Sequence, residues 1–64
     1  MKIFWYNDTT EVQTIFLGDF NGAPDVLKPL QGKEIYINAL ADNQALFIKQ
    51  WPGGKVLIST MVRG

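Results

Sequence analysis

The chain has no cysteine and no histidine among its 64 residues. Without cysteine no disulfide bridge can hold the fold together, and the usual zinc sites built from cysteine and histidine are excluded. The same two absences remove the common catalytic pairs of serine or cysteine with histidine. The sequence therefore predicts a fold held by its apolar core or by association, and it argues against catalysis.

Six acidic residues and a glycine-rich stretch remain as possible sources of chemistry. Catalysis by two carboxylates needs a close pair with one member desolvated, whereas all six acids lie in predicted turns or at predicted strand ends. Glycines 53–54 and Lys55 lead into a predicted strand, while a phosphate-binding loop opens a helix. We therefore expect no enzyme activity, no catalytic residues and no cofactor.

The spacing of Asp19, Asn21 and Asp25 weakly resembles that of a calcium-binding loop. Such a loop needs a glutamate at its twelfth position and a glycine at its sixth, but here Leu30 and a displaced Gly22 take those roles. We therefore expect no metal site.

The formal net charge is zero, which argues against non-specific binding to duplex nucleic acid. The apolar run at residues 3–6 is too short for a signal peptide or a membrane span, so we expect a cytoplasmic protein without membrane contact. Composition is uniform along the chain and predicts one small domain over residues 1–64. A chain of this size buries only about 60% of its unfolded surface, so a homodimer would add stability, although a monomer is also possible.

Two turn signals organise the C-terminal half of the chain. The turn at residues 52–54 places Ile48 opposite Ile58, and the turn at 42–43 places Ile37 opposite Ile48. Because both turns put the same apolar residues on one face, they predict a three-stranded antiparallel meander. Its core face would comprise Ile35, Ile37, Ala39, Leu46, Ile48, Val56, Ile58 and Val62.

A helix over residues 38–50 is the competing interpretation. This segment is rich in helix formers, Asn38 could cap its start, and residues 52–54 could end it. However, residues 42–43 would then lie in the middle of the helix, and the apolar residues 45–48 form a continuous run rather than a stripe. The pattern therefore favours the meander.

Residues 2–6 and 11–17 are predicted to form an N-terminal hairpin, with the first strand buried on both sides. Residues 25–27 are expected to form at most one helical turn before Pro29, and Val26, Leu27 and Leu30 could cap an open end of the barrel. The chain is thus predicted to be all-β, or β-rich with one short helical turn. Its expected architecture is a small five-stranded antiparallel barrel or curled sheet, with the hairpin followed by a meander over residues 34–63.

The second face of the predicted meander combines aromatic, aliphatic and cationic side chains. Its candidate binding residues are Tyr36, Phe47, Lys49, Trp51, Lys55, Leu57 and Met61. The N-terminal strands could fold over this face and close a barrel. Alternatively, the face stays exposed as a binding or oligomerisation surface, since exposed apolar patches of this kind usually have a use.

Two functions fit such a face. The first is a small protein–protein interaction module, such as an inhibitor, an adaptor or an accessory subunit, that binds a larger protein or itself. The alternative is single-stranded nucleic-acid binding, in which Tyr36, Phe47 and Trp51 stack on bases while the cationic side chains of Lys49, Lys55 and Arg63 follow the phosphates. The zero net charge favours the first.

Overall fold

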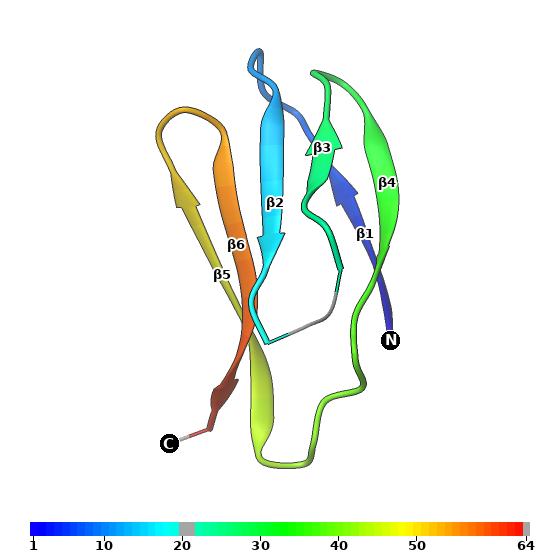
Figure 1. Ribbon diagram of the computed structural model, residues 1–64, viewed down its shortest axis with the longest axis vertical. Helices are drawn as coiled ribbons and strands as arrows, with labels where there is room; N and C mark the ends of the chain where they lie inside the picture. Colours follow the sequence, from blue (N-terminus) through cyan, green and yellow to red (C-terminus); the bar gives the residue numbers. More distant parts are fainter. Residues whose placement is uncertain (20–21, 64) are drawn as a thin grey trace.

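The computed structural model describes residues 1–19 and 22–63 and contains six β-strands and no helix within those ranges (Figure 1). The strands are β1 (Lys2–Tyr6), β2 (Gln13–Leu17), β3 (Asp25–Leu27), β4 (Gly32–Tyr36), β5 (Gln44–Trp51) and β6 (Lys55–Val62). The predicted all-β class is confirmed. The strands form two sheets that do not close into a barrel.

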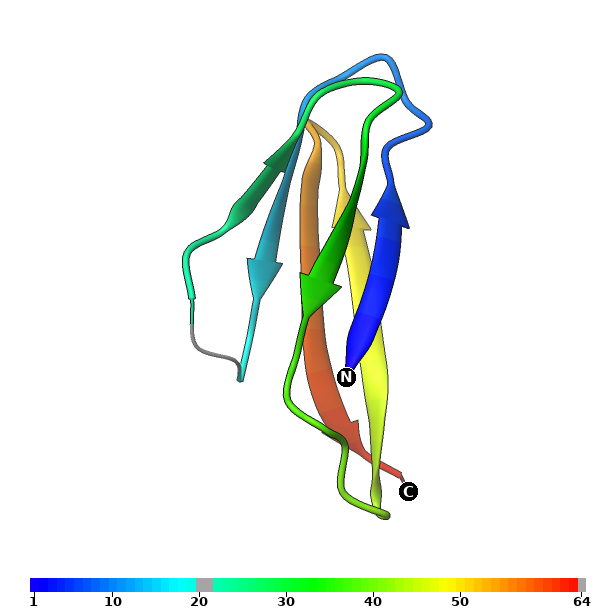
Figure 2. The ribbon, with the colours of Figure 1, turned by 90° about the vertical axis from the view of Figure 1, so that its right-hand side faces the viewer.

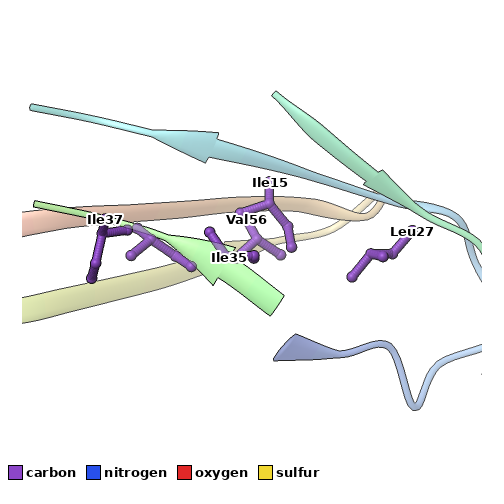
Figure 3. Close-up of a cluster of buried hydrophobic side chains, with 6 residues drawn as sticks. Ile15, Leu27, Ile35, Ile37 and Val56 are labelled. Carbon is purple, nitrogen blue, oxygen red and sulfur yellow. The ribbon is translucent and has the colours of Figure 1, made fainter. Parts of the chain in front are cut away.

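The larger sheet has four strands in the order β3-β2-β6-β5, and the smaller sheet pairs β1 with β4. All pairs are antiparallel except β2 with β6, which run parallel. The smaller sheet covers one face of the larger sheet, as the turned view shows (Figure 2). Six buried side chains from both sheets form the core between them (Figure 3): Ile15, Leu27, Ile35, Ile37, Val56 and Ile58.

The hairpin of β5 and β6 has the predicted register. Trp51 lies opposite Lys55 and Ile48 lies opposite Ile58, so the turn at residues 52–54 is confirmed. Gly53 and Gly54 have φ angles of 87° and 79°, the left-handed region that glycine adopts readily. The alternative helix over residues 38–50 is wrong, because β5 occupies most of that segment.

The predicted third strand of the meander is displaced. A turn does form before β5, where the Gln44 N–H donates to the Ala41 carbonyl at 2.9 Å. The preceding strand β4 pairs with β1 rather than with β5, and Ile37 exchanges two backbone hydrogen bonds with Met1 at 2.7 and 2.9 Å. Ile37 therefore does not lie opposite Ile48. As part of a second layer, β4 covers the apolar face of the larger sheet, which a single curled sheet would leave in water.

The predicted N-terminal hairpin is also wrong, because β1 and β2 belong to different sheets. β2 lies between β3 and β6 and runs parallel to β6. A parallel pair needs a long crossover connection, and the chain between β2 and β6 provides it. Residues 25–27 extend the sheet as β3 instead of forming a helical turn, since Asp25 pairs with Ile15 and Leu27 with Gln13.

The smaller sheet covers β5 only in part, and the predicted core is correspondingly reduced. Leu46 of β5 is half-buried against the core. Ile35, Ile37, Val56 and Ile58 are buried as predicted, but Ile48 is 45% exposed, and Ala39 and Val62 are also exposed. The accessible surface is 4466 Å², against about 4100 Å² expected for a compact monomer of this mass. The fold therefore leaves more surface open than its size requires.

Asn7, at the end of β1, is a fully buried polar residue with 0% exposure. Its side-chain nitrogen donates to the carbonyl of Glu11 at 2.7 Å and to that of Leu27 at 3.1 Å. Its side-chain oxygen accepts hydrogen bonds from the backbone N–H and the hydroxyl of Thr9, at 3.0 and 2.6 Å. One side chain thus joins the β1–β2 connection to the end of β3.

The backbone of Asn7 extends this junction to the turn before β4. The Asn7 N–H donates to the Gln31 carbonyl at 2.9 Å, and the Asn7 carbonyl accepts from the Leu30 N–H at 2.8 Å. Leu30 has a φ of 59°, an uncommon backbone conformation for a residue other than glycine. The hydrogen bond to Asn7 helps to hold Leu30 in that conformation.

Two further polar contacts join the sheets. The indole N–H of Trp5 in β1 donates to the side-chain oxygen of Gln13 in β2 at 2.9 Å, and Gln13 is buried. Lys33 in β4 forms an ion pair with Asp25 in β3. Together with Asn7, these contacts fix the smaller sheet over β2 and β3.

Gly54 fixes the β5–β6 turn to the start of β2. The Gly54 carbonyl accepts from the Thr14 N–H at 2.7 Å, which begins the parallel pairing of β2 with β6. A Cβ atom at Gly54 would lie 2.1 Å from the Val12 carbonyl oxygen, so no other residue fits there without movement. A Cβ atom at Gly53 would have no neighbour within 4 Å.

Replacing Asn7 should destabilise the fold severely. In Asn7→Ala, the partly buried carbonyl of Glu11 and the buried carbonyl of Leu27 lose a donor, and we expect a loss of about 2–3 kcal/mol in the free energy of unfolding. The exposed neighbour is the control, since Asp8→Ala should change that free energy by less than about 0.5 kcal/mol. Urea unfolding of both variants measures the difference. Equal effects would show that the Asn7 contacts contribute little.

Alanine at the two turn glycines should have unequal effects. Both variants place a side chain at positive φ, which costs roughly 1 kcal/mol. Gly53→Ala should show that cost alone, whereas Gly54→Ala adds the collision with the Val12 carbonyl and should lose about 2–4 kcal/mol. Thermal and urea unfolding of the pair test this. Equal losses would mean that the turn is not held against β2.

Candidate functional site

The candidate site is the side of the four-stranded sheet that faces away from β1 and β4, called here the outer face. Successive residues of a strand point to opposite sides of the sheet, and residues directly opposite each other on neighbouring strands point to the same side. Each residue paired with an outer-face residue therefore also lies on the outer face. The register pairs Phe47 with Ser59 and Lys49 with Leu57, and it carries the face onto β2 through Phe16, opposite Leu57. The outer face comprises Thr14, Phe16, Val26, Ala45, Phe47, Lys49, Trp51, Lys55, Leu57, Ser59 and Met61.

Large apolar side chains of the outer face are in contact with solvent. Phe47 is 38% exposed and Trp51 is 40% exposed, and Phe16, Val26 and Met61 are also exposed. These five residues come from all four strands, so the apolar surface extends across the whole sheet. A continuous apolar sheet face open to water is typical of an interaction surface.

The charge on this face has one sign. Among its described strand residues, Lys49 and Lys55 are the charged ones, and none is acidic. The Lys49 ammonium lies 5.1 Å from the centre of the Trp51 ring, within the range of a cation–π contact. Trp51, Pro52 and Lys55 line a shallow, open hollow at the turn end of the hairpin. The face can therefore accept an apolar group flanked by acidic groups.

Six of the seven predicted site residues lie together on the outer face: Phe47, Lys49, Trp51, Lys55, Leu57 and Met61. Of the two interpretations of this face, closure into a barrel is wrong, because β2 lies within the four-stranded sheet and β1, paired with β4, covers the opposite side of it. Leu57 is half-buried between its neighbours, and the other five are exposed.

Tyr36 is misplaced in the predicted site. It lies on β4, opposite Lys2 of β1, and therefore belongs to the smaller sheet. Tyr36 is 67% exposed on the other outside surface of the molecule, where its hydroxyl donates to the Glu34 carboxylate at 3.3 Å. The prediction failed because it assumed that β4 pairs with β5.

A second aromatic surface surrounds Tyr36. Phe4 and Tyr6 of β1 are exposed there, although the sequence predicts a first strand buried on both sides. The Lys2 ammonium lies 5.9 Å from the centre of the Tyr36 ring. Only one side of β1 packs on the core, through Ile3 and Trp5, because no described strand or loop covers the other side.

Phe16 and Val26 are outer-face residues that were not among the predicted site residues. Alternation in the second predicted strand does show that Thr14 and Phe16 share one side. It does not show which side is outside, because that depends on the parallel pairing of β2 with β6. Val26 reaches the face only because residues 25–27 form β3, opposite Thr14.

Other kinds of site have little basis in the described ranges. Within residues 1–19 and 22–63, no three acidic side chains gather closely enough to ligate a metal ion. Asn21, the middle residue of the calcium-like spacing, lies outside those ranges. A membrane-spanning helix is likewise not found there.

Comparison of the chain with protein-family models, with curated proteins and with solved structures found no match.

Proposed function

We propose that this chain is a small cytoplasmic protein–protein interaction module that binds a partner protein through the outer face. It acts as an inhibitor, an adaptor or an accessory subunit of a larger protein, and it has no catalytic centre. The observation that carries the proposal is the exposed apolar surface that Phe16, Val26, Phe47, Trp51 and Met61 form across four strands.

Two properties of the face support a protein partner. Aromatic residues and methionine are enriched in the centres of protein interfaces, and this face combines the three aromatic rings of Phe16, Phe47 and Trp51 with Met61. A rigid sheet backbone also holds these side chains in place before binding, which reduces the entropy lost on association. The two lysines lie at the turn end of the hairpin, where they favour a partner with acidic groups at the edge of its apolar surface.

The number of strands and the charged residues on the two outside surfaces favour the outer face over the smaller sheet as the binding site. The smaller sheet also exposes aromatic rings, but it has only two strands and mixes Lys2 with Glu34. The outer face has four strands and no acidic residue among its described strand positions. It therefore offers exposed apolar residues from all four of its strands and charge of a single sign.

Alanine variants on the two outside surfaces test the proposal. Trp51→Ala and Phe16→Ala should each weaken partner binding by about 2 kcal/mol or more, as expected for aromatic interface centres. Both residues are partly exposed, so each variant should lose only about 1 kcal/mol of stability. Tyr36→Ala, on the opposite surface, is the matched control and should leave binding unchanged.

The measurement has two stages. Proteins retained by the immobilised chain are identified by mass spectrometry, and the affinity of the retained protein is then measured by calorimetry for each variant. A partner lost in Tyr36→Ala but kept in Trp51→Ala and Phe16→Ala would contradict the proposal. A stability loss of about 3–5 kcal/mol in Trp51→Ala would assign that ring to the interior.

A second candidate function is binding of single-stranded nucleic acid on the same face. The contact between Lys49 and Trp51 favours it, because a cation beside an exposed ring resembles a stacking platform. Tyr36 cannot contribute to this platform, since it lies on the smaller sheet.

Salt dependence separates the two candidates. If Lys49 and Lys55 neutralise two phosphates, log K for a single-stranded oligonucleotide should fall with log salt at a slope of about −1.4. Lys55→Ala should reduce the slope to about −0.7 by the same rule. Fluorescence anisotropy with a labelled oligonucleotide measures both slopes. No binding at low salt would eliminate the nucleic-acid candidate and leave the protein-binding proposal intact.

A further inference from the structure

β5 presents an open edge. It is the last strand of the four-stranded sheet, and β6 is its one partner among the described strands. In Figure 1, no ribbon lies on the outer side of its upper half. β5 is eight residues long, and its pairing with β6 continues without a bulge. In its exposed half, from Phe47 to Trp51, Lys49 is the one charged residue, so the edge has little protection against pairing with another strand.

The hydrogen bonds show which backbone groups face outward. The Arg63 N–H donates to the Asn43 carbonyl at 2.8 Å, just beyond the last pair of β5 and β6. Pairs along an antiparallel ladder are alternately bonded and not bonded. The N–H and C=O groups of Leu46, Ile48 and Gln50 therefore point away from β6.

The pairing of β6 on its other side agrees with this assignment. The Ile58 carbonyl accepts from the Gly18 N–H at 2.9 Å, so Ile58 directs its backbone toward β2. Ile58 lies opposite Ile48, which accordingly does not exchange backbone bonds with it. The outward groups of Ile48 are thus available to a new strand.

We propose that the outer edge of β5 pairs antiparallel with β5 of a second copy of this chain, about a twofold axis at Ile48. Residues whose backbone N–H and C=O groups point away from β6 in one copy then lie opposite such residues in the second copy, as hydrogen bonding between antiparallel strands requires. In this register Ile48 lies opposite Ile48 of the second copy, Leu46 opposite Gln50, Phe47 opposite Lys49, and Ala45 opposite Trp51.

The side chains make this register self-complementary. Phe47 lies opposite a lysine, which allows a cation–π contact, and the large Trp51 lies opposite the small Ala45. The pairing also covers Ile48, which is 45% exposed where the smaller sheet ends. A twofold axis at Lys49 would place two lysines face to face, an arrangement that is destabilising across strands.

The joined sheet has eight strands, and the two outer faces lie side by side on the same surface of it. The smaller sheets lie on the other surface of the joined sheet, and neither β1 nor β4 pairs with the edge of β5, so the outward backbone groups of β5 stay free for the pairing. This inference goes beyond the proposed function. Backbone groups at the edge of β5 hold the two copies together, and the side chains of Phe47, Lys49 and Trp51 contact the second copy along the new strand pair. The rest of the outer face, on β2, β3 and β6, stays open to the partner protein.

Sedimentation of the full chain tests the dimer. A one-strand interface is small, so we expect a dissociation constant on the order of 10–100 μM. Ile48→Pro should raise that constant by roughly tenfold or more, because proline removes the outward N–H and is tolerated at an edge where that group is free. Phe16→Ala, on the outer face but two strands away from the edge, should leave it unchanged.

Single cysteines test the register, because the chain has no cysteine of its own. With oxidised glutathione as the oxidant, Ile48→Cys should form a disulfide-linked dimer. Val62→Cys is an exposed control on β6 and should not form one. The two β6 strands of the dimer are three strand spacings apart, about 14 Å, which is beyond the reach of a disulfide.

Three outcomes would overturn the inference. The first is a wild-type chain that stays monomeric up to about 1 mM, well above the expected dissociation constant; the edge would then be free for a strand of another protein. The second is equal crosslinking of Ile48→Cys and Val62→Cys. The third is a dimer weakened by Phe16→Ala but not by Ile48→Pro, which would place self-association on the outer face and leave the proposed function standing.

Discussion

The arrangement of the strands depends on the buried hydrogen bonds of Asn7. Its side chain bonds to the β1–β2 connection and to the end of β3, and its backbone bonds to the turn that precedes β4. A buried amide without partners would be strongly unfavourable, so these bonds hold the β1–β2 connection, the end of β3 and the turn before β4 together. With these segments joined, β1 pairs with β4 in a second layer and β2 lies in the larger sheet.

The two layers have unequal size, and this inequality explains the surface of the molecule. Two short strands cover only part of a four-stranded sheet, so the core is small and is centred on β2 and β6. β5 extends beyond that cover, which exposes Ile48 and leaves the edge of β5 open. Small domains of this size have little stability to spare, and association is a common way to supplement it.

The outer face and the edge of β5 adjoin each other, and they would use different chemistry. On the face, aromatic and aliphatic side chains would lose contact with water, which drives association without fixing direction. On the edge, backbone hydrogen bonds would set the direction and register of the added strand. A chain with both features could present two copies of its apolar face to one partner.

The sequence by itself determined those features that depend on neighbouring residues. Pro52 and the two glycines after it select the turn, and the turn selects the β5–β6 register, because a hairpin loop fixes which residues lie opposite each other. Alternation then predicts that Phe47, Lys49 and Trp51 share one side with Leu57. The all-β class and most of the candidate site follow from these local rules.

The tertiary structure alone decided which distant strands pair and which side of each strand is buried. Tyr36 left the predicted site because β4 pairs with β1, and Phe16 entered it because β2 runs parallel to β6. A period of two residues shows which side chains share a face, but both faces of these strands carry apolar residues. Only the packing of the smaller sheet on one of them, with the hydrogen bonds of Asn7, distinguishes the core from the outside.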